Sequence, residues 1–434
     1  AIVSVANLSE LNAALADTAG NKIIICSDGN YAGLSVSSKT YAAPVQVRAA
    51  TQLGAIFSSI SITNVSNLSL FQLKVVAVFS ASWGSAVAFN TCTRCSLIEC
   101  DVSFEPDPQL VRFGRCLSVI YGGSSYIDII GNNFHKFSKG YLNGGSYLRI
   151  LNNTFSEYNE DGLETQGITN SIIEQNIFRF GHGWGTVHAD FIAIDYAQSN
   201  NIIRDNFAYA NKFSASQGYA NTNGSTQSDM LIDGNIFCGS YTVHGVTSTS
   251  NCTRLTVKNN CLMNYLDGQQ DSLYLYRSDR GYTWVDSIHQ NNVGMAKPGP
   301  ITGVTNTGSV VMQNSNPAAA LYASDLFINP FRGESPADFL PIPGSAVDFG
   351  NDVGPWRLTQ RYVADQWCYI TNTSVETAAV TFTIQAYPGS NCPSLVGATY
   401  SWDFDEVGAE AGSGASPTHT YTAHGRHDVV CTIT

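Results

Sequence analysis

One short phrase recurs along the middle of the chain: an aliphatic run, a polar residue, an asparagine, and a large apolar residue one or two places later. It occurs as IDIIGNNF, RILNNTF, IIEQNIF, IIRDNF, LIDGNIF and TVKNNCL. The asparagines are spaced by 21, 23, 30, 29 and 25 residues and are Asn132, Asn153, Asn176, Asn206, Asn235 and Asn260. Self-similarity at a period of about 20 to 50 residues indicates a solenoid, in which each repeat is one coil.

The repeats predict a solenoid built from strands. Their apolar runs are short, alternate close to every second residue, and are bounded by Asn, Gly and Ser, which is typical of strands. Coils of a parallel β-helix stack at about 4.8 Å, so equivalent side chains form ladders. An inward-facing Asn at each bend can bond the backbone of the coils on either side, which satisfies a buried amide. We therefore predict an all-β fold with structural asparagines.

The first coil is predicted to carry a helix. The segment ANLSELNAAL is typical of a short helix, with Asn7 as the N-cap and Glu10 as the reciprocal partner of a capping box. A helix over the first coil would shield an otherwise open β edge. The sequence from SELNAALA through DGNYAGL to Val75 resembles the start of bacterial right-handed β-helix proteins that act on polysaccharides. The resemblance implies a right-handed parallel β-helix with an N-terminal capping helix.

The solenoid pattern decays after Asp271. The segment from Phe327 to Trp356, FINPFRGESPADFLPIPGSAVDFGNDVGPW, looks like the closing phrase of such β-helices. We predict that residues 1–354 form the catalytic solenoid and that residues 355–369 form a linker.

Residues 370–434 have a different character. They contain alternating strands at short intervals, typical of a β-sandwich. The segments YSWDFD and PTHTY closely resemble motifs of polycystic-kidney-disease (PKD) domains, and the departure is at Asp405-Glu406-Val407-Gly408. The resemblance implies a small immunoglobulin-like, PKD-like sandwich that serves as a spacer or carbohydrate-adjacent module, without catalytic residues.

Composition limits the possible partners. The net charge of −12 argues against nucleic acid, and it would repel an acidic polysaccharide unless a basic patch or a cation intervened. No run of 18 apolar residues exists, so no membrane insertion is expected. No signal peptide is present, and we expect a mature or engineered terminus. The expected location is secreted, extracellular or virion-associated, with no prediction of oligomeric state.

The cysteines allow two interpretations. Their number, eleven, leaves at least one outside any intrachain disulfide. Cys92, Cys95 and Cys100 have a spacing that hints at zinc, but neighbours along a strand point to opposite faces, which favours buried thiols. Cys392 and Cys431 could pair across the sandwich or remain thiols.

Two adjacent coils lose the regular pattern and gather polar residues. The coil after Asn153 contains YNEDGLETQ, and the next, longer coil contains GHGWGTVHADFIAID. Aligning the strands that follow sets Asp161 over Asp190, Leu163 over Ile192 and Gln166 over Asp195. Two carboxylates would then stack one coil apart.

These two motifs resemble those of secreted β-helix glycanases. In the rhizobial exopolysaccharide-depolymerase type, S-D-G-[FL] is followed one coil later by H-x-D-x-I-Q, and phage tailspike depolymerases have similar patterns. Here the motifs are EDGL, with Asp161, and HADFIA, with His188 and Asp190. Ala193 stands where the family has Gln, which affects the substrate contact of that Gln. The resemblance implies hydrolysis of a bacterial exopolysaccharide or capsular polysaccharide.

Glycoside hydrolysis needs one protonated and one ionised carboxyl group. Two stacked acids repel each other when both are charged, which raises one pKa and divides the roles of acid and base. A separation of about 5 Å would suit retention of configuration, and roughly 6.5 to 9.5 Å inversion. The predicted catalytic residues are Asp161, Asp190, Glu164 and His188. The structural alternatives are turn caps for the aspartates and a solvated groove position for Glu164.

Aromatic, amide and charged residues on these and neighbouring coils could bind sugars along an open groove, which suits internal cleavage of a polymer. The alternatives are loop packing and surface solvation. The candidate substrate-binding residues are Lys139, Tyr141, Gln166, Trp184, Asp195, Gln217, Tyr219, His244, Tyr274 and Arg277.

Two other functions stay open. A polysaccharide lyase would abstract a proton beside a uronate carboxyl with Lys139, Tyr141 or His188 as the base. Its acidic cluster could seat calcium, whereas hydrolysis requires no cofactor. A non-enzymatic carbohydrate-binding β-helix would have a shallow groove without a close carboxylate pair.

Overall fold

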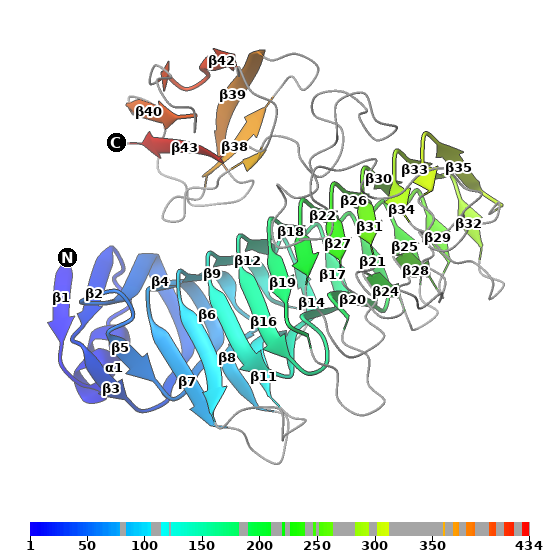
Figure 1. Cartoon of the computed structure of the whole chain (residues 1–434). Helices are drawn as coiled ribbons and strands as arrows, with labels where there is room; N and C mark the ends of the chain where they lie inside the picture. Colours follow the sequence, from blue (N-terminus) through cyan, green and yellow to red (C-terminus); the bar gives the residue numbers. More distant parts are fainter. Residues whose placement is uncertain are drawn as a thin grey trace.

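The chain forms a long parallel solenoid and, after it, two small sheets (Figure 1). The computed structural model describes residues 1–78, 84–105, 114–120, 123–181, 190–209, 219–221, 226–238, 246–248, 251–263, 283–294, 302–311, 359–360, 368–372, 379–386, 399–404, 412–420 and 428–433. Within this part of the chain, no helix is long and apolar enough to cross a membrane.

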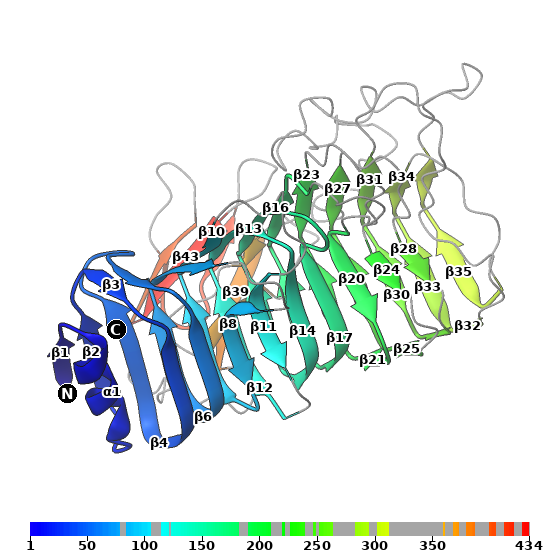
Figure 2. The same cartoon turned by 90° about the horizontal axis from the view of Figure 1, so that it is seen from below.

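The coils contribute strands to three faces, and strands of successive coils pair in parallel. The first face, seen in Figure 2, comprises β4 (Leu34–Ala49), β6 (Ile60–Phe71), β8 (Ser85–Asn90), β11 (Arg115–Ile120), β14 (Lys139–Ser146), β17 (Leu163–Thr169), β20 (Ile192–Asp195), β24 (Tyr219–Asn221) and β28 (Val246–Ser248). The second face begins with β1 (Ile2–Val5) and β2 (Lys22–Cys26), continues through the second halves of β4 and β6, and then comprises β9 (Thr93–Ile98), β12 (Ser125–Ile130), β15 (Arg149–Leu151), β18 (Ile172–Glu174), β22 (Ile202–Arg204), β26 (Leu231–Asp233), β30 (Thr256–Lys258), β33 (Ser287–Gln290) and β35 (Val304–Thr307).

Long strands that bend from the first face to the second join both faces into one 24-stranded sheet. The corner between them also carries β21 (Gln198–Ser199), β25 (Gln227–Ser228), β29 (Cys252–Thr253) and β32 (Trp284–Val285). The third face is a 12-stranded sheet of β3 (Gly29–Tyr31), β5 (Ala55–Phe57), β7 (Lys74–Val78), β10 (Asp101–Glu105), β13 (Asn133–Phe137), β16 (Thr154–Tyr158), β19 (Ile177–Arg179), β23 (Phe207–Tyr209), β27 (Ile236–Cys238), β31 (Cys261–Met263), β34 (Val293–Gly294) and β36 (Val310–Val311). The predicted β-solenoid is confirmed.

Stacked side chains fill the space between the faces. The rings of Phe134, Phe155 and Phe178 are buried and lie on successive coils, with centroids 5.0 and 5.1 Å apart. This spacing is close to the distance between neighbouring strands, so the backbone spacing itself sets the aromatic contacts.

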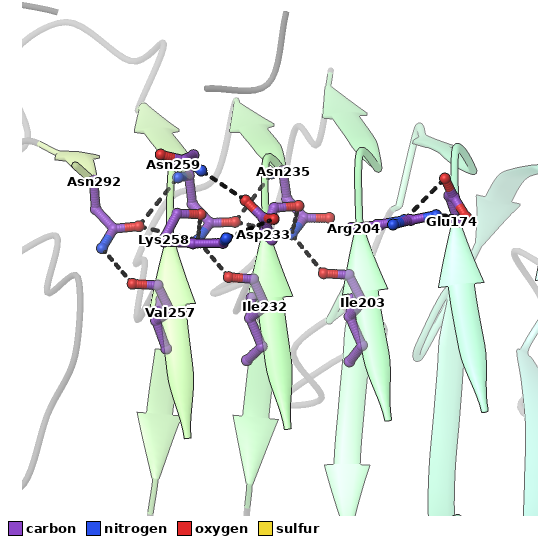
Figure 3. A network of polar contacts seen from close by, with 11 residues as sticks. Glu174, Ile203, Arg204, Ile232, Asp233, Asn235, Val257, Lys258, Asn259 and Asn292 are labelled. Atoms are coloured by element: carbon purple, nitrogen blue, oxygen red, sulfur yellow. Dashed lines mark hydrogen bonds and ion pairs between the residues drawn. The ribbon is translucent and has the colours of Figure 1, made fainter. Parts of the chain in front are cut away.

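The asparagine ladder follows the corner between the second and third faces. Asn153 Oδ1 accepts hydrogen bonds from the backbone N and the Nδ2 of Asn132, both at 2.9 Å. Asn153 Nδ2 donates to the carbonyl of Ile129 at 2.8 Å and to Asn176 Oδ1 at 3.0 Å. Figure 3 shows the same pattern further along, where Asn235 Nδ2 donates to the carbonyl of Ile203. The predicted structural role is confirmed.

The ladder is longer than the sequence pattern predicted. Asn292 adds a rung, because Asn260 donates from both its backbone N and its Nδ2 to Asn292 Oδ1. At the other end Cys100 replaces the amide: its backbone N donates to Asn132 Oδ1 at 2.8 Å. Its thiol, buried like those of Cys92 and Cys95, lies 3.4 Å from the backbone N of Leu73. Burial raises the pKa of Cys100 to about 12, in agreement with the buried-thiol interpretation.

The predicted N-terminal helix is confirmed as α1 (Leu8–Ala16). Asn7 Oδ1 caps it by accepting from the Glu10 backbone N at 3.0 Å. The Glu10 carboxylate in turn accepts from the backbone N of Ala6 at 2.8 Å. Leu11 and Leu15 are buried in the solenoid core, so the helix packs onto the first coil.

The C-terminal strands form two small sheets. The four-stranded sheet contains β37 (Thr359–Gln360), β43 (Asp428–Ile433), β40 (Tyr400–Asp403) and β41 (Gly412–Ser413), and the three-stranded sheet contains β38 (Cys368–Asn372), β39 (Ala379–Ala386) and β42 (Thr418–Thr420). Phe404 stacks on His419 with centroids 4.3 Å apart, which brings the two motifs together. The PKD-like assignment and the boundaries at 354 and 370 stay predictions. Cys431 is buried, and Cys392 lies outside the described residues.

Candidate active site on the first face

A lysine between two glutamates lies at the start of the β14 and β17 strands. Lys139 Nζ is 3.1 Å from Glu160 Oε1 and 2.5 Å from Glu164 Oε2. Desolvation favours the neutral lysine, but the neighbouring carboxylates, chiefly Glu164 and Glu160, outweigh it and raise the pKa of Lys139. Lys139 is therefore held as a cation that neutralises part of an acidic cluster.

The two aspartates predicted to stack lie on adjacent coils. Leu163 pairs with Ile192 and Gln166 with Asp195, so the predicted register of the two strands is confirmed. The backbone N of Asp190 donates to Asp161 Oδ1 at 3.2 Å.

The two aspartates are almost enclosed by protein. Asp161 is 8% exposed and Asp190 is 1% exposed. Burial, followed by the charge of Asp190, raises the pKa of Asp161 well above its ordinary value, against a smaller opposing effect of Lys139. Asp161 therefore holds its proton at a pH at which an ordinary aspartate has lost it.

Gly162 allows this close stacking. A Cβ at this position would lie 2.5 Å from the ring of Phe178 and 2.9 Å from the carbonyl oxygen of Phe191. Its own backbone N donates to the carbonyl of Asp190 at 2.9 Å. Because glycine has no side chain, the backbone at Gly162 can approach the next coil closely and place Asp161 against it.

Glu164 corrects one expectation. It alternates with the core residues Leu163 and Thr165 and so points outward, but it is only 6% exposed instead of facing open solvent. Lys139 contacts one of its carboxylate oxygens, and Gln166 Nε2 donates to the other. Neighbouring polar side chains on the same face cover it.

A polar network continues from Glu164 across the first face. Tyr141 OH donates to Gln166 Oε1 at 2.9 Å and accepts from Asn143 Nδ2 at 2.7 Å. The Arg115 guanidinium lies 4.1 Å from the centre of the Tyr141 ring. Burial raises the pKa of Tyr141, with the charge of Glu164 adding to this effect against the opposing hydrogen bond from Asn143.

Of the remaining predicted site residues, only Asp195 and Tyr219 lie within the described part of the chain. Tyr219 lies in β24, and its backbone pairs with Ile192. The predicted residues outside the described part of the chain are His188, Trp184, Gln217, His244, Tyr274 and Arg277. Asp195 pairs in register with Gln166 and is 9% exposed.

The cluster also contains three residues that were not predicted from the sequence: Arg115, Asn143 and Glu160. Glu160 stands in the EDGL motif, and its contact with Lys139 joins residues 21 apart in the chain. Arg115 pairs in register with Lys139 and Asn143 with Gln166. Extending the coil alignment one turn toward the N-terminus would have found Asn143.

The calcium site that the sequence allowed in this acidic cluster stays a prediction. Among the described residues, no group of three or more His, Cys, Asp or Glu side chains is arranged to hold a metal ion. Glu160 and Glu164 instead share Lys139 as their cation.

The chain matches no protein-family model and no curated protein. Solved structures do match. The Dettilon tailspike protein is 13% identical, with 88% of this chain and 78% of that chain covered at a TM-score of 0.52. An alginate lyase from Paenibacillus sp. str. FPU-7 is 14% identical, with 62% and 99% covered at a TM-score of 0.45. The catalytic domain of a GH87 α-1,3-glucanase in complex with tetrasaccharides is 11% identical, with 73% and 66% covered at 0.49.

At these identities the likeness concerns the fold and not the activity. The match to the tailspike covers most of both chains, so the two proteins share the all-β solenoid architecture.

Proposed function

We propose that this chain hydrolyses glycosidic bonds within a bacterial exopolysaccharide or capsular polysaccharide, with Asp161 as the general acid and Asp190 as its ionised partner. The observation that carries the proposal is the stacking of the two buried aspartates, in which the backbone N of Asp190 donates to Asp161 Oδ1 at 3.2 Å. Burial and then Asp190 raise the pKa of Asp161, which agrees with the role of an acid. An acid that keeps its proton beside a charged carboxylate is what glycoside hydrolysis requires.

In the proposed reaction Asp161 gives its proton to the glycosidic oxygen as the bond from that oxygen to the anomeric carbon breaks. Asp190 either attacks the anomeric carbon to form a glycosyl ester, which water activated by the now ionised Asp161 then hydrolyses, or deprotonates a water that attacks the anomeric carbon directly. The first route retains and the second inverts the configuration of the new reducing end. NMR of the fresh product distinguishes the two.

Lys139 has a positioning role in this proposal. It lies between Glu160 and Glu164 and limits the negative charge beside Asp161. Without it the acid would hold its proton more tightly and give it up less readily to a leaving group.

The same environment disfavours a lyase that uses a described residue as its base. The pKa values of Lys139 and Tyr141 are both raised, so both side chains are protonated near neutral pH. Lys139 is also committed to two glutamates and is poorly suited to neutralise the carboxyl group of a uronate. A lyase that relies on His188 would still form an unsaturated product, which makes the product a decisive readout.

The architecture supports a polymer as the substrate. Strands β8 to β28 form a long first face (Figure 2). Such a face suits a polysaccharide that lies along it better than a small metabolite. Because such polymers are found outside the cell, we propose that the protein acts outside the cell or on a virion.

A panel of purified bacterial polysaccharides tests the proposal by viscosity, reducing-end release and ultraviolet absorbance of unsaturated sugars. The expected result is a fall in viscosity before many reducing ends appear, without new absorbance. New absorbance would establish a lyase instead. Binding without any product would establish a carbohydrate-binding protein, and rapid monosaccharide release with slow viscosity loss would establish an end-acting enzyme.

A further inference from the structure

Tyr196 is an exposed aromatic residue in a backbone conformation that suits glycine. It directly follows β20, has a φ of 59° and is 51% exposed. A bulky residue in the left-handed region is strained and persists only where the surroundings fix its backbone. The backbone is fixed here, because Gln227 Nε2 on the next coil donates to the Tyr196 carbonyl at 2.5 Å.

The preceding coils show that the fold does not need an aromatic ring at this position. Since Gln166 pairs with Asp195 and Asn143 with Gln166, the equivalent residues are Gly167 and Gly144. Both have positive φ, 62° and 65°. A Cβ on Gly167 would meet only the Ala197 carbonyl oxygen, at 3.9 Å, so the space outside it is open. The ring of Tyr196 therefore lies beside a stretch of the first face, at Gly144 and Gly167, that carries no side chains.

Hydrogen-bonding groups border this stretch. Asn143, Gln166 and Asp195 occupy equivalent positions on three successive coils, one residue before the glycines and Tyr196. The first two belong to the network that leads through Tyr141 to Glu164. An aromatic ring beside two amides and a carboxylate is a combination that can bind a sugar ring, because the sugar has an apolar face that stacks and hydroxyls that form hydrogen bonds.

We propose that Tyr196 forms a remote sugar-binding subsite, at which the apolar face of a neutral pyranose stacks on the tyrosine ring. This inference rests on the proposed function for its choice of ligand. The Asp195 carboxylate next to the ring would repel a uronate. Asn143 and Gln166 offer amides to the hydroxyls of the same or the adjoining sugar.

The distance from the carboxylate pair gives this subsite a measurable consequence. Asp161 precedes β17, whereas the position equivalent to Tyr196 is Gly167, six residues later. Six residues of strand extend about 20 Å, so several sugar units must lie between the bond that is cut and the ring of Tyr196. Short oligosaccharides would miss the subsite, and longer ones would gain from it.

The ring is best removed by the substitution Tyr196→Gly, because glycine stands at the equivalent position in the two preceding coils. This variant relieves the backbone and is expected to be at least as stable as the wild type to heat. Losing one stacked ring should weaken binding roughly 3- to 10-fold, from the range of aromatic contacts. Tyr196→Phe should bind like the wild type. The matched control is Asn152→Gly, which changes another positive-φ residue, at the corner of the second and third faces.

Affinity electrophoresis in gels that contain each purified polysaccharide of the panel measures binding without requiring turnover. Size-fractionated oligosaccharides of any polymer that the wild type shortens then measure kcat/KM against chain length. The expected result is that Tyr196→Gly loses retention and also loses the advantage of long over short oligosaccharides. Retention and chain-length dependence equal to the wild type would overturn the subsite.

These arms separate the two proposals. If the wild type shortens a polymer and Asp161→Asn does not, while Tyr196→Gly matches the wild type in both assays, the hydrolase stands and the subsite fails. If no polymer is shortened but Tyr196→Gly alone loses retention, the subsite stands and the hydrolase fails. No retention of the wild type in any gel, with no polymer shortened, overturns both.

Discussion

The backbone N of Asp190 donates a hydrogen bond to Oδ1 of Asp161 across the gap between two coils, at 3.2 Å. The two acids are therefore one coil apart at the point where the third face turns into the first. After burial, Asp190 has the largest influence on the pKa of Asp161.

Asp161→Asn should lower kcat/KM by about 100-fold or more, because the amide keeps the shape of the acid but cannot donate its proton in the same way. Asp190→Asn should have a similar effect. Reducing-end assays on folded protein, checked by circular dichroism, measure this. The matched control is Asp229→Asn, at an exposed aspartate paired with Arg254, and it should retain activity. Near-normal turnover of both active-site variants would remove the proposed pair.

The raised pKa of Asp161 also predicts how stability depends on pH. The folded state holds this proton more tightly than the unfolded state, whose aspartate has a pKa of about 3.9. The resulting stabilisation is fully present below the unfolded pKa and is lost as the pH rises through the folded pKa. Urea midpoints of the wild type should therefore fall relative to those of Asp161→Asn as the pH rises above about 4. Parallel curves for the two proteins would contradict this.

Lys139→Met should move the alkaline limb of the pH profile of kcat/KM to higher pH. Lys139 lowers the pKa of Asp161, so its removal makes the acid retain its proton longer. Lys258→Met, which removes a lysine 3.6 Å from Asp233 on the second face, is the control and should leave the profile unchanged. An unchanged profile for Lys139→Met would show that Lys139 does not influence the acid.

Asn176→Leu should destabilise the solenoid strongly. The amide serves the backbone N and Nδ2 of Asn153, the carbonyl of Ile150 and Oδ1 of Asn206. Each buried group left without a partner costs about 1 to 3 kcal/mol. Asn133→Leu, at an exposed asparagine on the third face, should change the urea midpoint little. Equal midpoints for the two variants would refute the ladder as a source of stability.

Arg149→Met should cost about 3 to 5 kcal/mol, because it leaves the Asp128 carboxylate buried without its cation. Arg149 Nε donates to Asp128 Oδ1 at 2.6 Å, and Nη2 bonds the other oxygen. The double variant Arg149→Met/Asp128→Leu should recover much of the loss, since no buried charge remains. Chemical unfolding of both variants tests this, and a double variant as unstable as the single one would show that packing, and not charge, is what was lost.

The solenoid could be predicted from the sequence because its repeat is local. Each ladder asparagine has the same short phrase around it, and the stacking of coils converts sequence period into contact. The N-cap of α1 and the pairing of Leu163 with Ile192 follow from equally local patterns. Asn292 was missed because its preceding run, SIHQN, contains a buried histidine where the other repeats have an aliphatic residue.

The candidate site could be predicted only in part. Alignment of two coils brought Asp161 and Asp190 together. The contact between Lys139 and Glu160 depends instead on the number of residues in the coil that separates them, and no motif specifies that number. Alternation correctly placed Glu164 on the outer side of its strand but could not show that Lys139 and Gln166 enclose it.

The sequence by itself therefore determined the coil, its ladder and which residues share a face, because these depend on the period of the chain and the geometry of a strand. Only the tertiary structure decided that the pKa of Asp161 is raised and that the ring of Tyr196 is exposed. The burial of Asp161 and the charges around it come from side chains on three coils. The exposure of Tyr196 depends on Gly167 of the preceding coil, which has no side chain. Both are properties of surroundings assembled from distant parts of the chain, and the residues themselves do not carry them.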